Sequence, residues 1–164
     1  MSDERANDRR SWKLRVLTDP RELSLQAWVR LIRAREVIGR RLERVFARHG
    51  LTPAQFDVLA TLQHGDGITQ QELSERLLVT KGNVCGLIDR AEAAGWVERR
   101  PDPEDRRANR LYMTRRGRER LAETLPDHRA VIEQVLGRLG PGKLQDLHDL
   151  LDDLVDSAAE DEPR

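Results

Sequence analysis

Residues 69–117, TQQELSERLLVTKGNVCGLIDRAEAAGWVERRPDPEDRRANRLYMTRRG, decide the fold of this chain. The stretch opens with Thr69, a residue type favoured at the N-cap of a helix, and Glu72 follows at the spacing of a capping box. Leu73 and Leu77 lie four residues apart and give the helix one apolar side. The beginning of the stretch therefore predicts a short helix.

A second helix is predicted after Thr80, another residue suited to an N-cap. Apolar residues recur at the spacing i, i+3, i+4, i+7, which places them on one helical face: Val84, Leu87, Ile88 and Ala91. Gly95 is suited to the left-handed position that ends a helix. Two short helices joined by a tight turn over residues 69–94 predict a helix-turn-helix, in which the second helix enters the major groove of DNA.

A β-hairpin is predicted directly after these helices, over residues 96–113. Residues 96–100 and 110–113 read as two strands, with Leu111 and Met113 on one side. The sequence PDPED at 101–105 is typical of a turn, because proline fixes φ and aspartate bonds to nearby backbone. A hairpin with a basic tip, attached to a helix-turn-helix, predicts a winged helix-turn-helix, and Thr114 is suited to cap the helix that follows.

Four segments resemble the MarR-type (multiple antibiotic resistance regulator) transcriptional regulators, namely residues 51–62, 69–77, 83–100 and 105–117. The resemblance implies a mainly α fold with a small β-wing, in which the N- and C-terminal helices build a helical dimerisation region. It also implies a homodimer that regulates transcription by binding a pseudo-palindromic double-stranded DNA operator. Repression, with release by a small aromatic or phenolic ligand, is the default expectation for such a regulator.

The first part of the chain is expected to contain a mobile lead and two helices. Residues 1–20 mix both charges with small polar residues and form the expected lead, with a helical turn near Trp12. The winged domain is expected over residues 21–158, beginning with a helix from about Pro20 to His49. One stripe of this helix repeats at threes and fours and is predicted to be buried: Leu25, Trp28, Ile32, Gly39, Leu42 and Phe46.

A second helix is predicted to begin at Thr52, as N-cap, and Pro53, which fits the first helical position. Three apolar residues supply its core side: Phe56, Leu59 and Leu62. Gly65 and Gly67 are expected to end it, and Ile68 predicts a short strand.

After the wing, residues 115–158 are expected to join residues 21–49 as dimerisation helices, with a turn at 137–142. The last helix carries an apolar seam of the kind that packs lengthwise on another helix: Leu144, Leu147, Leu151, Leu154 and Ala158. The seam packs either inside its own subunit or across a two-fold dimer, and the resemblance favours the dimer. Residues 159–164 form an acidic tail.

The charge of the chain is balanced overall but unevenly distributed. The net charge is zero, yet residues 96–120 hold nine arginines against five acids, whereas residues 143–164 hold two bases against eight acids. A basic wing can present a positive face to DNA despite overall neutrality. A charge run can also be plain solvated surface, but its place on a winged helix-turn-helix favours DNA.

Other function classes find little support in the sequence. The single cysteine excludes an internal disulfide, and the four histidines show no zinc-ligand spacing. There is no apolar run long enough for a membrane span, no signal peptide, no nucleophile–base pairing and no phosphate loop. We therefore expect a cytoplasmic, nucleoid-associated protein that is not an enzyme and has no cofactor or metal.

The outward side of the second helix in the helix-turn-helix supplies the candidate DNA contacts. With the apolar face inward, the residues expected to meet DNA are Thr80, Lys81, Gly82, Asn83, Cys85, Gly86 and Arg90. Lys81 and Arg90 suit phosphate, and Asn83 suits the edge of adenine. Each glycine costs a helix roughly 1 kcal/mol against alanine, and close approach to DNA would compensate. Asp89 would be repelled by phosphate and is expected to form a salt bridge within the subunit.

At the wing tip, residues 105–107 match an Asp-x-Arg signature of the family. By that resemblance Arg107 enters the minor groove and Asp105 orients it, while Arg106 reaches the backbone. A narrow minor groove concentrates negative potential, and arginine is less strongly hydrated than lysine. The alternative is that these are turn residues on a solvated hairpin.

Two alternative functions stay open. Cys85 suggests a redox-sensing regulator, although a small residue is all that its position needs. A winged helix can also serve as a protein-interaction module without ligand control, but such a module would not need the arginines of the wing.

A ligand site is also expected. The resemblance implies a cleft between the first, second and fifth helices, beside the dimer interface. Arg35 lies within the arc of Trp28, Ile32 and Gly39, where an apolar residue is expected and a charge is costly unless paired. Either Arg35 forms a salt bridge, or it holds a ligand carboxylate while Trp28 and Phe56 stack against the ligand ring.

Overall fold

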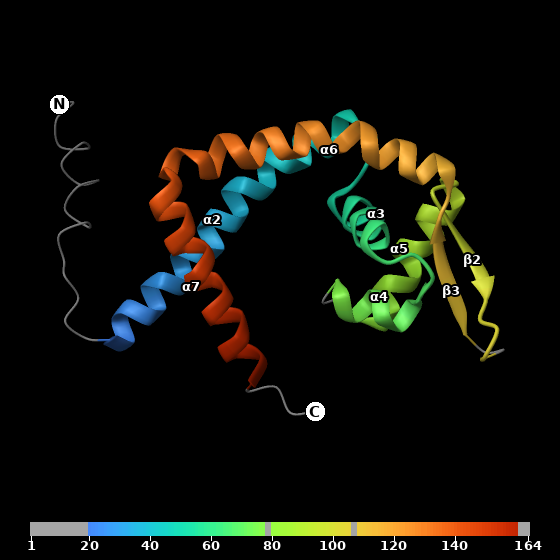
Figure 1. Cartoon of the computed structure of the whole chain (residues 1–164), viewed down its shortest axis with the longest axis horizontal. Coiled ribbons are helices and arrows are strands. Elements are labelled where there is room, and N and C mark those ends of the chain that lie inside the picture. Colours follow the sequence, from blue (N-terminus) through green and yellow to red (C-terminus); the bar gives the residue numbers. More distant parts are fainter. Residues whose placement is uncertain (1–19, 78–79, 106–107, 161–164) are drawn as a thin grey trace. The chain divides into compact units, whose positions relative to one another are not determined.

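The computed structural model describes residues 20–77, 80–105 and 108–160. The chain divides into two compact units, Met1–Gly39 and Arg40–Arg164. Its elements follow in chain order (Figure 1): α2 (Pro20–Arg48), α3 (Pro53–His64), β1 (Ile68–Thr69), α4 (Gln70–Arg76), α5 (Lys81–Ala93), β2 (Val97–Pro101), β3 (Asn109–Met113), α6 (Arg115–Leu136), the 3-10 helix η1 (Gly137–Leu139) and α7 (Pro141–Glu160). This order confirms the predicted winged helix-turn-helix, in which α4 and α5 are the two helices and β2–β3 is the wing.

Threonine caps begin four helices, as the sequence predicts. Thr69 and Glu72 form a reciprocal capping box at α4, with the Thr69 N–H donating to Glu72 Oε2 at 2.6 Å. Thr52 forms a second capping box, with Gln55 of α3 as its partner. Thr80 caps α5, and Thr114 caps α6. Each cap satisfies N–H groups that a helix leaves unpaired at its start, which fixes where the helix begins.

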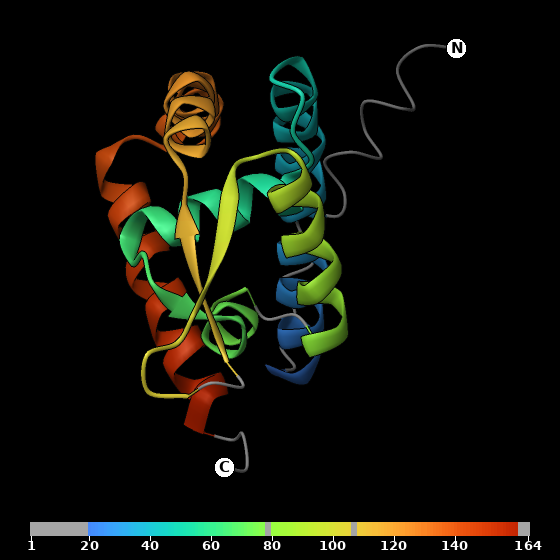
Figure 2. The same ribbon diagram turned by 90° about the vertical axis from the view of Figure 1, so that its right-hand side faces the viewer.

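The three strands form an antiparallel sheet in the order β1-β3-β2. Ile68 pairs with Leu111, and Val97 pairs with Met113. These four side chains are buried, whereas the outer ends of β2 and β3 are exposed. Figure 2 shows the hairpin beside α5. The sheet therefore anchors the base of the wing in the core and leaves its far end open to solvent.

The core lies under the helix-turn-helix and contains every apolar residue predicted for α3 and α5. It gathers apolar side chains from α2 through α6, among them Phe46, Phe56, Leu59, Leu62, Leu73, Val84, Leu87, Ile88, Ala91, Leu111, Met113 and Leu121. Gly95 ends α5 with φ at 72°, the left-handed conformation that the sequence predicts. The backbone then enters β2 through Trp96.

The predicted burial of the first helix holds only for its C-terminal part. Phe46 is buried and Leu42 half-buried, but Leu25 and Trp28 are 67% and 60% exposed. The expected burial of Leu25, Trp28 and Ile32 is therefore wrong for the described part of a single chain. The predicted helical turn near Trp12, like the lead up to residue 19, lies outside the described residues.

The C-terminal helices follow the prediction, with one correction. The turn expected at 137–142 is shorter, because residues 137–139 form η1 and α7 already begins at Pro141. Gly140 adopts φ 75°, which reverses the chain, and proline fits the first turn of a helix. Along α7, Leu151 and Leu154 are exposed, while Leu144 and Leu147 are half-buried. None of the described helices is both long enough and apolar enough to cross a membrane.

Candidate DNA-binding surface

The outward side of α5 carries small and polar residues above a fully apolar inner side. Val84, Leu87, Ile88 and Ala91 are buried beneath it. The predicted contact residues on the other side are exposed or half-buried: Thr80, Gly82, Asn83, Cys85, Gly86 and Arg90. Lys81 is the first residue of α5, but its side chain lies outside the described part of the structure. The helix therefore gathers the predicted contact residues along one element.

The two glycines of α5 are not required by packing against the residues that the structure describes. Among the described residues, a Cβ atom built on Gly82 would have no neighbour within 4 Å, and one on Gly86 would meet only the Arg90 guanidinium, at 3.4 Å. Neither residue has a positive φ. Because glycine weakens a helix by up to about 1 kcal/mol relative to alanine, the fold alone gives no reason for glycine at either position.

Asp89 forms the salt bridge that the sequence predicts, and its partner is Arg99 of β2. The Arg99 Nη2 atom lies 2.5 Å from Asp89 Oδ1, and Nη1 bonds the carboxylate of Glu92. The Arg99 backbone N–H also donates to Glu92 Oε1 at 3.3 Å. Burial lowers the pKa of Arg99, but the hydrogen bonds to Asp89 and Glu92 outweigh it, so the pKa lies above its ordinary value.

Asp102 organises the tip of the wing. Its carboxylate is buried, accepts the Glu104 N–H at 2.9 Å and pairs with the Arg110 Nε atom at 2.8 Å. The backbone N–H of Glu104 is the main reason that the pKa of Asp102 lies below its usual range. The Asp102 N–H donates to Ala108 O, and the Ala108 N–H donates to Asp105 O. The backbone is thus fixed on both sides of Arg106 and Arg107, which lie outside the described residues.

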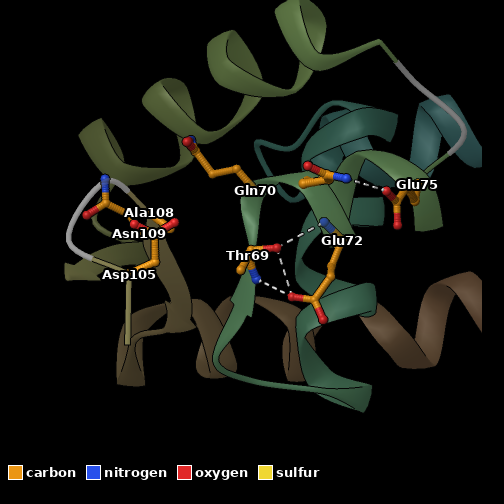
Figure 3. A pocket seen from close by; sticks show the side chains of 8 residues that line it. Thr69, Gln70, Glu72, Glu75, Asp105, Ala108 and Asn109 are labelled. Carbon is orange, nitrogen blue, oxygen red and sulfur yellow. Dashed lines mark hydrogen bonds between the residues drawn. The ribbon is translucent and has the colours of Figure 1, made fainter. Parts of the chain in front are cut away.

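A cavity of about 410 Å³ lies between the start of α4 and the wing tip (Figure 3). Glu72, Glu75 and Asp105 line it, together with the amides of Gln70, Gln71 and Asn109. Glu72 is already engaged by the Thr69 N–H and hydroxyl, which lower its pKa. Three carboxylates disfavour an anionic ligand, so this cavity does not suit an aromatic acid.

The residues expected to bind a ligand lie in different environments. Trp28 and Arg35 are exposed on the N-terminal part of α2. Phe56 is 5% exposed and stacks on both Phe46 and His128, with ring centroids 4.5 Å and 4.7 Å away, and those two rings lie 6.0 Å from each other. The Phe56 ring is therefore already covered by protein, and the ligand pocket stays a prediction.

Ionisable groups surround that aromatic stack. Burial lowers the pKa of His128 and raises that of Asp57, and their mutual attraction opposes both shifts. Asp127 pairs with His49 and Arg48 at 3.1 Å each, which holds its pKa below the usual range. Within the described ranges, no cluster of histidine, cysteine and acidic residues could hold a metal ion.

Sequence reasoning missed two organising residues, Arg99 and Arg110. The sequence signals their charge but not their partners, because each partner comes from another element or depends on strand register. Arg110 lies opposite Arg100 in the sheet and reaches both Asp102 and the Gly67 carbonyl. Only the folded hairpin brings these groups together.

Comparison with known proteins identifies relatives of this arrangement. The family model described as MarR family matches residues 49–108. The HTH-type transcriptional regulator YkoM of Bacillus subtilis, itself uncharacterised, is 34% identical over 103 residues, which cover 63% of this chain and 67% of YkoM.

Two solved structures extend the similarity to the fold. Sco3205 of Streptomyces coelicolor, a MarR family transcriptional regulator in complex with DNA, has a TM-score of 0.75 and 25% identity, covering 81% of this chain and 86% of that one. BpsR of Bordetella bronchiseptica, whose DNA binding is regulated by 6-hydroxynicotinic acid, has a TM-score of 0.73 and 25% identity, covering 79% of this chain and 98% of that one.

Proposed function

Because this chain belongs to the MarR family of transcriptional regulators, we propose that it binds a pseudo-palindromic double-stranded DNA operator as a homodimer and represses transcription. The observation that carries the proposal is the outward side of α5, which combines an exposed asparagine with glycines that the fold does not require. The Sco3205 complex supports the same class of ligand. This role lies in regulation rather than catalysis, in the cytoplasm at the nucleoid.

In this proposal α5 is the recognition helix. Asn83 reads an adenine edge through its paired donor and acceptor, while Arg90 and Lys81 contact phosphates. Gly82 and Gly86 allow the helix backbone to approach the DNA, where a side chain would hold it away. Thr80 caps the helix and contacts a phosphate of the DNA backbone. Cys85 places a small side chain on the surface that faces the DNA. The alternative is that Cys85, whose thiol is exposed, senses oxidants.

The wing is proposed to make the second contact, in the minor groove. Arg107 inserts into the groove, Asp105 orients it and Arg106 reaches the phosphate backbone. The Asp102–Arg110 pair supports this role, because it holds the backbone on both sides of residues 106–107. A rigid base lowers the entropy that an arginine loses on insertion.

The dimer is proposed to bury apolar side chains of the terminal helices. Exposed apolar residues occur on α2 and α7: Leu23, Leu25, Trp28, Val29, Leu31, Ile32, Val37, Leu150, Leu151, Leu154 and Val155. Exposed apolar patches of this extent are typical of interfaces rather than of free surface. A two-fold dimer would present two copies of α5 to half-sites about one helical turn, ~10 bp, apart.

The decisive experiment is binding of the purified chain to duplex DNA, followed by fluorescence anisotropy over a range of salt concentrations. We expect specific binding whose affinity falls steeply with salt, because phosphate contacts release counterions. Arg107→Ala should weaken binding by roughly 1–3 kcal/mol. Arg138→Ala, on η1 and outside the wing, is the control. Salt-insensitive binding or an unaffected Arg107→Ala variant would overturn the assignment and favour the protein-interaction alternative.

Control by a small aromatic acid is proposed as well, with support from the regulation of BpsR by 6-hydroxynicotinic acid. Arg35 would hold the carboxylate, and the exposed Trp28 on the same helix would stack against the ligand ring. The effect on operator affinity is limited by the ligand's differential binding to the DNA-free and DNA-bound states. A panel of aromatic acids is screened by operator release, then repeated with Arg35→Ala and with Arg33→Ala as the control on the same helix. Equal release from the Arg35→Ala variant would mean that the pocket lies elsewhere.

A further inference from the structure

Arg99 connects the wing to the recognition helix. It lies on β2, and its guanidinium bonds Asp89 and Glu92, two carboxylates on α5. Its backbone N–H adds a third bond, to Glu92. Arginine is suited to this geometry, because its planar fork presents several donors in fixed directions, which the single ammonium of lysine cannot do.

One of the two carboxylates lies on the side of α5 that the proposed function assigns to DNA. Asp89 follows Gly82 by seven residues and Gly86 by three, so all three lie on one side of a helix with 3.6 residues per turn. The Asp89 side chain is 66% exposed and that of Glu92 is 42% exposed. A carboxylate in this place faces the phosphates of a bound duplex and repels them.

We propose that Arg99 is a positioning residue for DNA recognition, which acts by cancelling the negative charge that Asp89 and Glu92 on α5 would otherwise present to the DNA. The inference rests on the proposed DNA-binding function and assigns to Arg99 a role without direct contact to DNA. Its side chain is only 20% exposed, whereas its two partners are more open to solvent.

Arg99 is more buried than its two carboxylate partners, and this difference determines the effect of removing its guanidinium. The three groups together carry one negative charge, and loss of the guanidinium leaves two carboxylates next to the proposed interface. These carboxylates are already solvated, so the fold can tolerate the change, but an approaching phosphate meets stronger repulsion. The main effect of the substitution is therefore on DNA binding and on its salt dependence, rather than on stability.

The test compares four variants on a duplex that the wild-type chain selects from a random-sequence library. Arg99→Met removes the charge but keeps an unbranched side chain, and Arg99→Lys keeps the charge but not the fork. A triple variant adds Asp89→Asn and Glu92→Gln to Arg99→Met. The matched control is Arg120→Met on α6, which removes a partly buried arginine that pairs with one acid, Glu123, at 3.2 Å.

We expect Arg99→Met to bind about tenfold more weakly at ~0.1 M salt, with a deficit that shrinks as salt rises. Arg99→Lys should lose less. The triple variant should return to within about threefold of the wild type, or bind more tightly, since it has no carboxylates left to cancel. Arg120→Met should bind as the wild type does.

Recovery in the triple variant is the outcome that a purely structural role would not produce. If the triple variant binds as weakly as Arg99→Met, or if Arg120→Met loses as much affinity, the proposal is overturned. If circular dichroism shows that Arg99→Met is unfolded at the assay temperature, the triple and lysine variants test the proposal instead. Weak binding by the triple variant then overturns it, and binding close to that of the wild type supports it. A wild-type chain that selects no specific duplex overturns the proposed function itself, whereas a binding chain with an unaffected Arg99→Met overturns only this inference.

Discussion

Substituting Gly117 by alanine should destabilise the fold, although alanine is the better helix former. Gly117 lies in the first turn of α6, and its N–H donates to the capping hydroxyl of Thr114 at 3.0 Å. A Cβ atom at this position would lie 2.2 Å from the Trp96 carbonyl oxygen and 2.8 Å from Met113 Cγ. The Met113 side chain can move, but the Trp96 oxygen belongs to the backbone where the chain leaves α5 for β2.

Two opposing effects set the magnitude. Alanine in place of glycine favours a helix by up to about 1 kcal/mol. Against this, overpacking of a well-filled site costs about 1–3 kcal/mol, and the Trp96 oxygen also accepts the Thr114 N–H and hydroxyl at 2.9 Å and 3.2 Å. Displacing that oxygen weakens both bonds, each with a net value of about 1 kcal/mol. The net loss of unfolding free energy should be about 2–4 kcal/mol.

The measurement is urea unfolding followed by circular dichroism, with Gly82→Ala as the matched control. A Cβ on Gly82 meets nothing within 4 Å, so the same chemical change should there leave stability unchanged or raise it by up to about 1 kcal/mol. The DNA affinity of the Gly82→Ala variant should fall, because the added methyl group lies on the proposed interface. A Gly117→Ala variant as stable as Gly82→Ala would refute the close approach of α6 to Trp96.

Further predictions concern pH and assembly. Burial lowers the folded-state pKa of His128 below its unfolded value, so the unfolded chain takes up the proton first and stability falls as pH drops through about 6.5. His128→Phe keeps an aromatic ring beside Phe56 and removes the titration, so its melting temperature should fall less than that of the wild type between pH 7 and pH 5; parallel curves would contradict this. Removal of residues 142–164 deletes most of α7 and should yield monomers or aggregates without specific DNA binding, and an intact dimer in light scattering would speak against the seam.

Local signals were read correctly from the sequence because they involve residues that are close in the chain. The Thr69–Glu72 capping box spans one helical turn, and the buried face of α5 follows from helical periodicity alone. Even the salt bridge of Asp89 could be expected, since a carboxylate on that face needs a partner. The identity of that partner could not be predicted, because Arg99 reaches α5 only once β2 has paired with β3.

The errors have physical reasons of the same kind. The sequence predicts that the turn after α6 ends at Gly142, but Pro141 begins α7, since proline favours the first helical turn as much as it favours a loop. The stripe of α2 was expected to be buried along its length, because periodicity identifies an apolar face but not what covers it. In the single chain, Leu25 and Trp28 are exposed.

The exposure of apolar residues on α2 and α7 links DNA binding to assembly. If the apolar faces of α2 and α7 are buried only in a dimer, part of the folding free energy of these helices depends on protein concentration. The monomer would still hold an intact core around α3, α4 and α5, because the buried residues of that core all come from residues 40–164. Dilution should therefore weaken operator affinity before it unfolds the recognition helix. Two half-sites bound by a preformed dimer gain from effective concentration, and separate monomers lose that gain without losing any contact of α5.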